Sequence, residues 1–242
     1  MRPKLVVLQL LLLALLAESA IALSCLNTLT VWPLSGVVPA NAQWIVEVNR
    51  PAETSLRAFF LAEHADASAT IPLEQVSTAG AGGRWQVVLR PSSPLPVGSG
   101  PYVLMARVAS VLNPTIDRQI SLEQWLVGPS DRTAPRWLEH PRIVDSSATD
   151  SDWGQSLAVE ILAPASEPVA ILAEIRGHAN PLLRRFELFL LLKEDLAKAY
   201  SGPCGGNLHF PSRGTYSASL TAINAGGNKS KSAPRIRIRR PR

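Results

Sequence analysis

The sequence has few of the residues from which most active sites are built. It contains four histidines and two cysteines among 242 residues, and no histidine stands within metal-ligand spacing of another histidine or of a cysteine. It also lacks a Gly-x-Ser-x-Gly nucleophile motif and a glycine-rich loop that would open a helix and cradle a phosphate. These absences argue against a zinc enzyme, a typical serine hydrolase and a nucleotide-binding protein. We therefore expect no catalytic residues, no cofactor and no metal.

One acidic stretch has the oxygen ligands that calcium prefers. Asp145, Asp150 and Asp152 are interspersed with serines and a threonine. Their spacing matches no EF-hand loop and no bidentate glutamate follows, so we expect a solvated loop. The histidines are expected on the surface or in loops, at positions 64, 140, 178 and 209.

The only long apolar run is N-terminal and has the form of an export signal. Arg2 and Lys4 precede an apolar segment that ends in Ala20-Ile21-Ala22, the small-x-small form of a cleavage site. The run is shorter than the roughly 20 residues that span a bilayer. We expect removal of residues 1–22, no transmembrane anchor afterwards, and a location in the periplasm, the outer envelope or the extracellular space.

The two cysteines, Cys25 and Cys204, admit three interpretations. In an exported protein a disulfide between them is the default, and we favour it. Ala22-Leu23-Ser24-Cys25 also resembles a bacterial lipobox, which would place a lipid anchor on Cys25. Two free thiols are the third interpretation. The intact mass of the exported protein distinguishes the three.

The net charge of +5 is a property of the C-terminus. Of the 24 basic residues, seven lie in the last fourteen positions, and two more belong to the signal segment. The remaining body has more acidic than basic residues. A general nucleic-acid-binding surface is therefore not expected.

Short runs of alternating apolar and polar residues follow the N-terminal segment. In 43–49, for example, Trp44, Val46 and Val48 share one side. Such period-two alternation is typical of strands with one buried face. Candidate strands in the first half are 29–34, 43–49, 56–63, 70–76, 84–90, 102–108 and 119–127. Short strands at about ten-residue spacing predict an antiparallel sandwich.

The second half repeats this pattern after a polar, turn-rich boundary at 128–135. Alternation resumes in 157–161, 169–175 and 216–222. In 192–200, by contrast, Leu192, Leu196 and Tyr200 recur at four-residue steps, which predicts a short amphipathic helix. We expect an all-β protein of two tandem antiparallel sandwich domains, 23–130 and 131–242, after an N-terminal signal helix, with one short helix in the second domain.

Four segments resemble the immunoglobulin-like (Ig-like) and fibronectin-III-like modules of bacterial envelope proteins. The segment 32–42 is similar to their opening pattern, and 94–104 to a strand entry within them. Asp131-x-Thr133-Ala134-Pro135 resembles the junction into a following module, and 220–228 resembles the closing pattern, with Asn224 in place of the usual aspartate. The resemblance implies an exported, bacterial two-module protein. It brings no catalytic residues, because such modules usually serve as spacers or binders.

Six tryptophans raise the question of carbohydrate binding. Trp44 and Trp85 are in register with buried residues and are expected in the core. Trp125 falls on the face opposite its apolar neighbours and is expected to be exposed. The other three, Trp32, Trp137 and Trp153, precede turns or lie in loops. We favour core or interdomain positions for the tryptophans over a sugar-binding role.

The C-terminal run from Arg235 to Arg240 is the sharpest chemical feature. Its alternation predicts a last strand in which Ile236 and Ile238 point inward. The side chains of Arg235, Arg237 and Arg239 would then form an outward row that, with Arg240, could hold a polyanion. The alternative, which we favour, is a charged edge strand that resists aggregation.

The sequence therefore predicts an exported cell-envelope protein with a non-catalytic structural or binding role. Its partner would be an unidentified protein or envelope polymer. A first alternative is a module that binds an anionic glycan or lipid head group through the arginine row. A second is a hydrolase with no recognisable motif.

Overall fold

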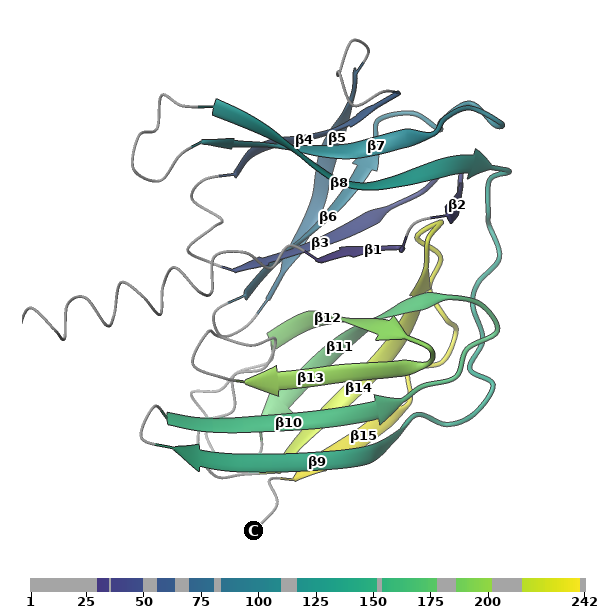
Figure 1. Cartoon of the computed structure of the whole chain (residues 1–242). Helices are drawn as coiled ribbons and strands as arrows, with labels where there is room; N and C mark the ends of the chain where they lie inside the picture. The colour runs from purple at the N-terminus through teal and green to yellow at the C-terminus, as the bar shows by residue number, and fades with distance from the viewer. Residues whose placement is uncertain are drawn as a thin grey trace, which may run out of the picture.

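The protein is all-β over the part of the chain that the computed structural model describes. That part comprises residues 30–34, 36–49, 56–63, 70–80, 84–109, 117–151, 154–177, 186–201 and 215–239. Within it, fifteen strands form two sheets and no helix occurs (Figure 1). Consequently none of the described residues belongs to a helix long and apolar enough to cross a membrane. The predicted signal segment 1–22, Cys25, Cys204 and Arg240 lie outside the described residues.

The first sheet contains eight strands and changes partners at β5. The strands are β1 (Thr30–Trp32), β2 (Gly36–Pro39), β3 (Trp44–Asn49), β4 (Leu56–Ala62), β5 (Thr70–Ala79), β6 (Arg84–Pro91), β7 (Tyr102–Ala109) and β8 (Asp117–Gly128). Their order is β1-β3-β6-β5-β4-β7-β8-β2. The start of β5 pairs with β4 and the rest pairs with β6. All pairs are antiparallel except β2 with β8, which is parallel.

A single apolar core lies between the two arms of this sheet. It includes side chains from β3 and β6 of one arm and from β4, β7 and β8 of the other. At its centre the rings of Trp44 and Trp125 meet edge to face, with centroids 5.7 Å apart and planes at 64°. Aromatic pairs favour this geometry because the positive ring edge faces the negative ring face. The two arms therefore enclose one common core.

The expectation that Trp125 is exposed was wrong. Its side chain is 1% exposed, and its indole Nε1 donates a hydrogen bond of 2.9 Å to the carbonyl of Leu34. The pairing of β7 with β8 shifts register between Val103 and Met105, so β8 carries an irregularity between Ser121 and Gln124. Such a bulge exchanges the inward and outward positions that follow it. Leu122 and Trp125, three residues apart, consequently both pack on the core.

The second sheet contains seven strands and changes partners at β12. The strands are β9 (Arg142–Ser151), β10 (Gly154–Leu162), β11 (Val169–Gly177), β12 (Phe186–Lys193), β13 (Leu196–Ser201), β14 (Thr215–Asn224) and β15 (Arg235–Arg239). Their order is β15-β14-β11-β12-β13-β10-β9, and all pairs are antiparallel. Apolar side chains from both arms again enclose one core.

The predicted helix at 192–200 is instead a hairpin. Leu192 pairs with Ala197 and Lys193 with Leu196, so β12 and β13 are joined by the two-residue turn Glu194-Asp195. Both turn residues have positive φ, 52° and 64°. Two-residue turns with positive φ at both positions match the twist of antiparallel strands. The four-residue spacing of Leu192, Leu196 and Tyr200 arises because the turn interrupts two period-two runs.

The acidic stretch expected to be a loop is part of a strand. Asp145 and Asp150 lie in β9, which pairs with β10, while Asp152 is outside the described residues. The polar residues of β9 gave no alternating apolar signal because residues 144–147 are exposed on both faces of the strand. The short parallel strand β2 was missed as well. The remaining strands predicted from alternation are confirmed in both halves.

Candidate binding face and module interface

The strand β15 places its arginines and isoleucines on opposite faces. Ile236 and Ile238 are 7% and 1% exposed and belong to the second core. The side chains of Arg235, Arg237 and Arg239 are exposed. The predicted inward isoleucines are thus confirmed. Same-face residues of a strand are about 6.8 Å apart, which sets the spacing of the three arginines.

The strand next to β15 adds a row of hydroxyl groups to the arginine row. Opposite residues of neighbouring strands point to the same face. Across β15 and β14 the pairs are Arg235 with Ser219, Arg237 with Ser217, and Arg239 with Thr215. We call the six residues of these pairs the arginine face. Guanidinium and hydroxyl groups side by side donate hydrogen bonds to phosphate and sulfate oxygens. One of these hydroxyls, that of Ser219, donates to the carbonyl of Ala233 at 3.5 Å.

One further arginine joins this surface from β11, and sequence reasoning missed it. Arg176 lies opposite Ser217 and is exposed. It is 61 positions from Arg237 in the chain, so only the sheet register brings the two together. Glu174 is opposite Ser219 on the same strand. Arg142 pairs with Glu139 at 3.4 Å, whereas Arg235, Arg237 and Arg239 form no ion pair with a carboxylate among the described residues.

The other predicted site residues form no common site in the described part of the chain. His140 is exposed and its Nδ1 is 2.9 Å from the carbonyl of Pro141. The histidines at 64, 178 and 209 lie outside the described residues, as do Cys25 and Cys204. No group of three or more His, Cys, Asp or Glu side chains that could hold a metal ion occurs among the residues described.

The two sheets meet through a small apolar cluster. The first sheet provides Trp32, Ile45 and Val88, and the second provides Ala170, Phe189 and Ile223. All six are buried, with exposed fractions of 7% or less. In Figure 1 the strands β1 and β3 lie over β11 and β12 at this boundary. Burial of apolar area here favours association of the two halves by about 25 cal/mol per Å².

A buried glutamine adds directional hydrogen bonds to the apolar contact between the two sheets. Gln86 on β6 is 0% exposed. Its Nε2 donates to the carbonyl of Phe189 at 2.7 Å, and its Oε1 accepts from the amide N–H of the same residue at 2.6 Å. Its Nε2 also donates to Glu47 at 2.6 Å. The glutamine side chain therefore binds β12 of the other sheet as a neighbouring backbone would.

Three separate turn motifs of the sequence converge where the chain passes from one sheet to the other. Asn41 Nδ2 donates to the carbonyls of Asp131 at 2.7 Å and of Gly226 at 3.1 Å, and Asn41 Oδ1 accepts from the Asp131 amide at 2.9 Å. Asn224 Nδ2 donates to Asp131 Oδ2 at 2.6 Å, and Asn228 Nδ2 to the Asp131 carbonyl at 3.0 Å. The connecting segment, the β2–β3 turn and the turn after β14 are thereby joined. We call this network the junction network.

The glycine at 226 allows the close approach in the junction network. A Cβ atom on Gly226 would lie 2.7 Å from the carbonyl oxygen of Asp131, which is closer than real Cβ contacts. A backbone carbonyl can move aside only with the segment that carries it. The glycine at this position of the segment 220–228 is therefore needed for the contact with the connecting segment.

Glu167 lies at the edge of the junction network and is held in an unfavourable environment for its charge. Its Oε2 accepts a hydrogen bond of 3.3 Å from Asn224 Nδ2. Burial raises the pKa of Glu167 above its ordinary value, and the nearby Asp131 carboxylate raises it further, while the bond from Asn224 opposes these effects. The carboxylates of Glu167 and Asp131 thus both accept hydrogen bonds from the side-chain amide of Asn224.

Comparison with known proteins identifies no family for this chain. No family model and no curated protein matches the sequence. Among solved structures, a type I pullulanase from Bacillus subtilis complexed with maltose is 12% identical over 84% of this chain and 24% of the pullulanase, with a TM-score of 0.25. Dimeric latent PorU from Porphyromonas gingivalis is 11% identical over 89% of this chain and 20% of PorU, with a TM-score of 0.34. A marsupial T cell receptor is 9% identical over 86% and 70%, with a TM-score of 0.26.

The chain spans about a quarter of the pullulanase and a fifth of PorU. All three TM-scores are below 0.5. These similarities therefore carry no argument about function, which has to come from the residues themselves.

Proposed function

We propose that the protein is an exported cell-envelope protein with a non-catalytic structural or binding role, built from two Ig-like modules that act as one rigid unit. The module boundary is taken at 130/131, within the segment that connects β8 to β9. Export rests on the sequence of residues 1–22 and not on any described contact.

The strand order supports the Ig-like assignment. In an Ig-like sandwich the first, second and fifth strands form one layer, and the third, sixth and seventh strands form the other. When the short strand β2, which lies beside β8, is left out of the count, the first, second and fifth strands of the first sheet are the neighbours β1, β3 and β6. The third, sixth and seventh strands are the neighbours β4, β7 and β8. In the second sheet β9-β10-β13 and β11-β14-β15 are the corresponding neighbours. The two sheets therefore share one arrangement.

The module interface is the observation that carries the proposed role. Interfaces between domains are often polar and permit relative motion. Here an apolar cluster, the two-point bond between Gln86 and Phe189, and the junction network all connect the same two modules. A rigid two-module body holds surfaces at a fixed distance and orientation, which is what a spacer or a presenting scaffold requires.

Two measurements on the full chain test this proposal. Fractionation of bacteria that produce the full chain should place the protein in the envelope or outside the cell, and deletion of 1–22 should retain it in the cytoplasm. The purified protein should unfold in a single cooperative transition, because the modules stabilise each other. Cytoplasmic retention of the full chain, or two independent unfolding transitions, would contradict the proposal.

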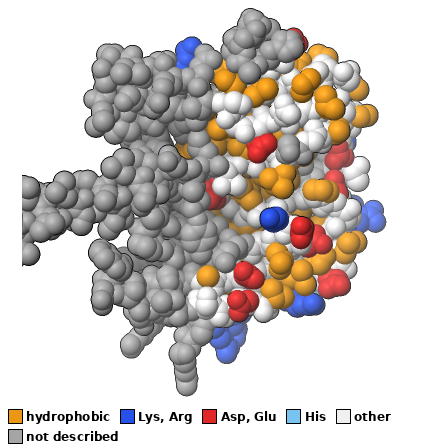
Figure 2. Space-filling view, viewed as in Figure 1, with side chains coloured by type: hydrophobic (Ala, Val, Ile, Leu, Met, Phe, Trp, Pro, Cys, Tyr) orange, Lys and Arg blue, Asp and Glu red, His pale blue; other side chains and the backbone are white. Residues whose placement is uncertain are grey.

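Anion binding by the arginine face is a second candidate function. The observation that favours it is the row of three exposed arginines without a carboxylate partner among the described residues, flanked by hydroxyl groups. On the side of the molecule shown in Figure 2, by contrast, basic, acidic and apolar side chains are interspersed. A ligand with anionic groups at about 7 Å spacing would match the arginine row.

Retention on a dextran sulfate column tests the second candidate. Replacing the three arginines of β15 by serine should abolish retention at about 0.1 M salt, and retention of the parent should fall steeply as salt rises. A matched variant removes the same charge from exposed arginines elsewhere, by Arg90→Ser, Arg132→Ser and Arg136→Ser. Equal loss of retention in both variants would mean that net charge alone, and not the arginine face, binds the polymer.

A further inference from the structure

A hollow of about 470 Å³ lies on the second module next to the arginine face, since its lining residue Ala233 accepts a hydrogen bond of 3.5 Å from Ser219. Its walls come from two connections that are far apart in the chain. The β8–β9 connection provides residues 137–141, and the β14–β15 connection provides residues 232–234. This volume is within the range of about 300–1,000 Å³ that is usual for small-molecule sites.

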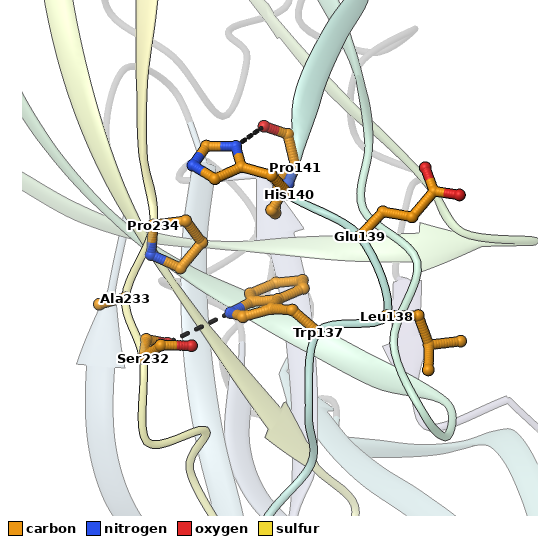
Figure 3. Close-up of a pocket in the computed structure, with 8 residues that line it drawn as sticks. All are labelled: Trp137, Leu138, Glu139, His140, Pro141, Ser232, Ala233 and Pro234. Atoms are coloured by element: carbon orange, nitrogen blue, oxygen red, sulfur yellow. Dashed lines mark hydrogen bonds between the residues drawn. The ribbon is translucent and has the colours of Figure 1, made fainter.

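The indole of Trp137 is fixed in this hollow before any ligand arrives. Its Nε1 donates a hydrogen bond of 3.2 Å to the carbonyl of Ser232, which joins the two connections. The ring is half-buried and packs against the second core. Figure 3 shows the indole and the rings of His140 and Pro234 grouped where the two connections meet. The hollow therefore has a wall of three rings, of which the indole is flat and apolar and is held in place by its hydrogen bond.

Polar groups at the rim complement these rings. The carbonyl of Pro141 can only accept, so the proton of a neutral His140 lies on Nδ1 and its Nε2 is an acceptor. The hydroxyl of Ser232 has no partner among the described residues and can donate or accept. Glu139, the acidic residue of the lining, is paired with Arg142 at 3.4 Å. The hollow thus carries little net charge.

We propose that this hollow binds the ring of a neutral sugar. A pyranose has an apolar C–H face that stacks on an indole and hydroxyl groups around its edge that reach donors and acceptors at a rim. Because the lining of the hollow carries little net charge, it does not attract acidic ligands. A proline-rich peptide, which also docks on aromatic residues, presents carbonyl acceptors and uses donors at the edge of those residues. Here the indole donor is already occupied by Ser232. The proposal is independent of export and of the arginine face.

Titration with neutral oligosaccharides tests this proposal. The full chain is titrated with maltohexaose, cellohexaose and chitohexaose by calorimetry and screened against an array of neutral glycans. We expect saturable binding of at least one neutral glycan that does not change between about 50 and 500 mM salt, because the ligand is uncharged. Binding of none of them, or binding of a decaproline peptide alone, would overturn the proposal.

Two variants locate the binding in the hollow. Ala233→Arg fills the hollow from an exposed position, and Trp137→Leu keeps an apolar side chain on the core but removes the flat ring. Each should weaken binding tenfold or more while thermal melts confirm folding. Ser93→Arg, which adds the same side chain to an exposed turn of the first module, should leave the affinity unchanged. An affinity that is unaffected by Ala233→Arg would overturn the proposal.

Discussion

At the scale of single residues, the neighbours Ile236 and Arg237 lie in opposite environments, one buried in the core and the other exposed to solvent. Ile236 is 7% exposed and packs in the second core, whereas Arg237 is exposed on the same strand. Ile236→Asp would bury a charge without a partner, so we expect a loss of about 2–5 kcal/mol in the free energy of unfolding. Chemical denaturation of the parent and the variant measures this loss.

The neighbouring residue provides the control. Arg237→Ser should change the free energy of unfolding by less than about 0.5 kcal/mol, as is usual for exposed positions away from special contacts. An Ile236→Asp protein that unfolds like the parent would mean that residues 235–239 do not pack on the second core in solution.

Glu167 gives the stability of the protein a defined dependence on pH. Because its pKa is raised in the native state, chiefly by burial, the native state keeps a proton that the unfolded chain has already lost. The contribution of Glu167 is therefore most favourable below its ordinary pKa of 4.5 and becomes less favourable as pH rises through the raised pKa. We expect Glu167→Gln to raise the melting temperature at pH 7 and to lose this advantage near pH 4.

Thermal melts at the two pH values measure this effect. Glu63→Gln serves as the control because Glu63 is exposed after β4, and it should shift the melting temperature little at either pH. A lower melting temperature for Glu167→Gln at pH 7 would show that the bond from Asn224 requires a carboxylate and outweighs the cost of burial.

At the scale of strands, alternation predicts an element well only while its pairing is regular. In β3, β6, β7 and β15 every second residue, on the inward face, is apolar without interruption, and all four strands were identified from the sequence. A bulge in β8 reversed the prediction for Trp125, and a two-residue turn between β12 and β13 imitated helical spacing. Neither interruption contains the glycine or asparagine that usually marks one.

The turn between β12 and β13 can be improved. Glu194 and Asp195 both have positive φ, which costs a residue other than glycine about 1 kcal/mol or more. Asn-Gly is the preferred pair for such turns. We expect Glu194→Asn with Asp195→Gly to raise the free energy of unfolding by about 0.5–1 kcal/mol, after the larger entropy of the unfolded glycine is subtracted.

Denaturation curves of this double variant also discriminate between a turn and a helix. In a helix interior, glycine costs about 1 kcal/mol relative to alanine, so the double variant would be destabilised if 192–200 were helical. Asp195→Val should lower stability because a β-branched side chain fits the left-handed region poorly. Both variants preserve the backbone bond in which the Ala163 amide donates to the Asp195 carbonyl at 2.9 Å.

At the scale of the whole molecule, sequence analysis recognised the segments that form the interface but did not predict that they contact one another. The motifs around Asn41, Asp131 and Asn224 were recognised as the opening, junction and closing segments of a family resemblance. They lie about 90 residues apart, and the hydrogen bonds that join them depend on how the two modules dock. Gln86 gave no signal either, because a polar residue on the outward face of one module is ordinary until another module covers it.

The contribution of Gln86 to the joining of the modules can be measured with one substitution. Gln86→Leu keeps the size of the side chain but leaves the N–H and carbonyl of Phe189 buried without partners. Each unpaired buried group costs about 1–3 kcal/mol, so we expect a loss of about 2–5 kcal/mol. Because the loss falls at the interface, proteolysis of the connecting segment 129–141 should become faster, and the single unfolding transition should broaden or split.

Gln75→Leu makes the same change at an exposed position of β5 and should do neither. A Gln86→Leu protein as resistant to protease as the parent would show that the apolar cluster and the junction network hold the modules together without the glutamine.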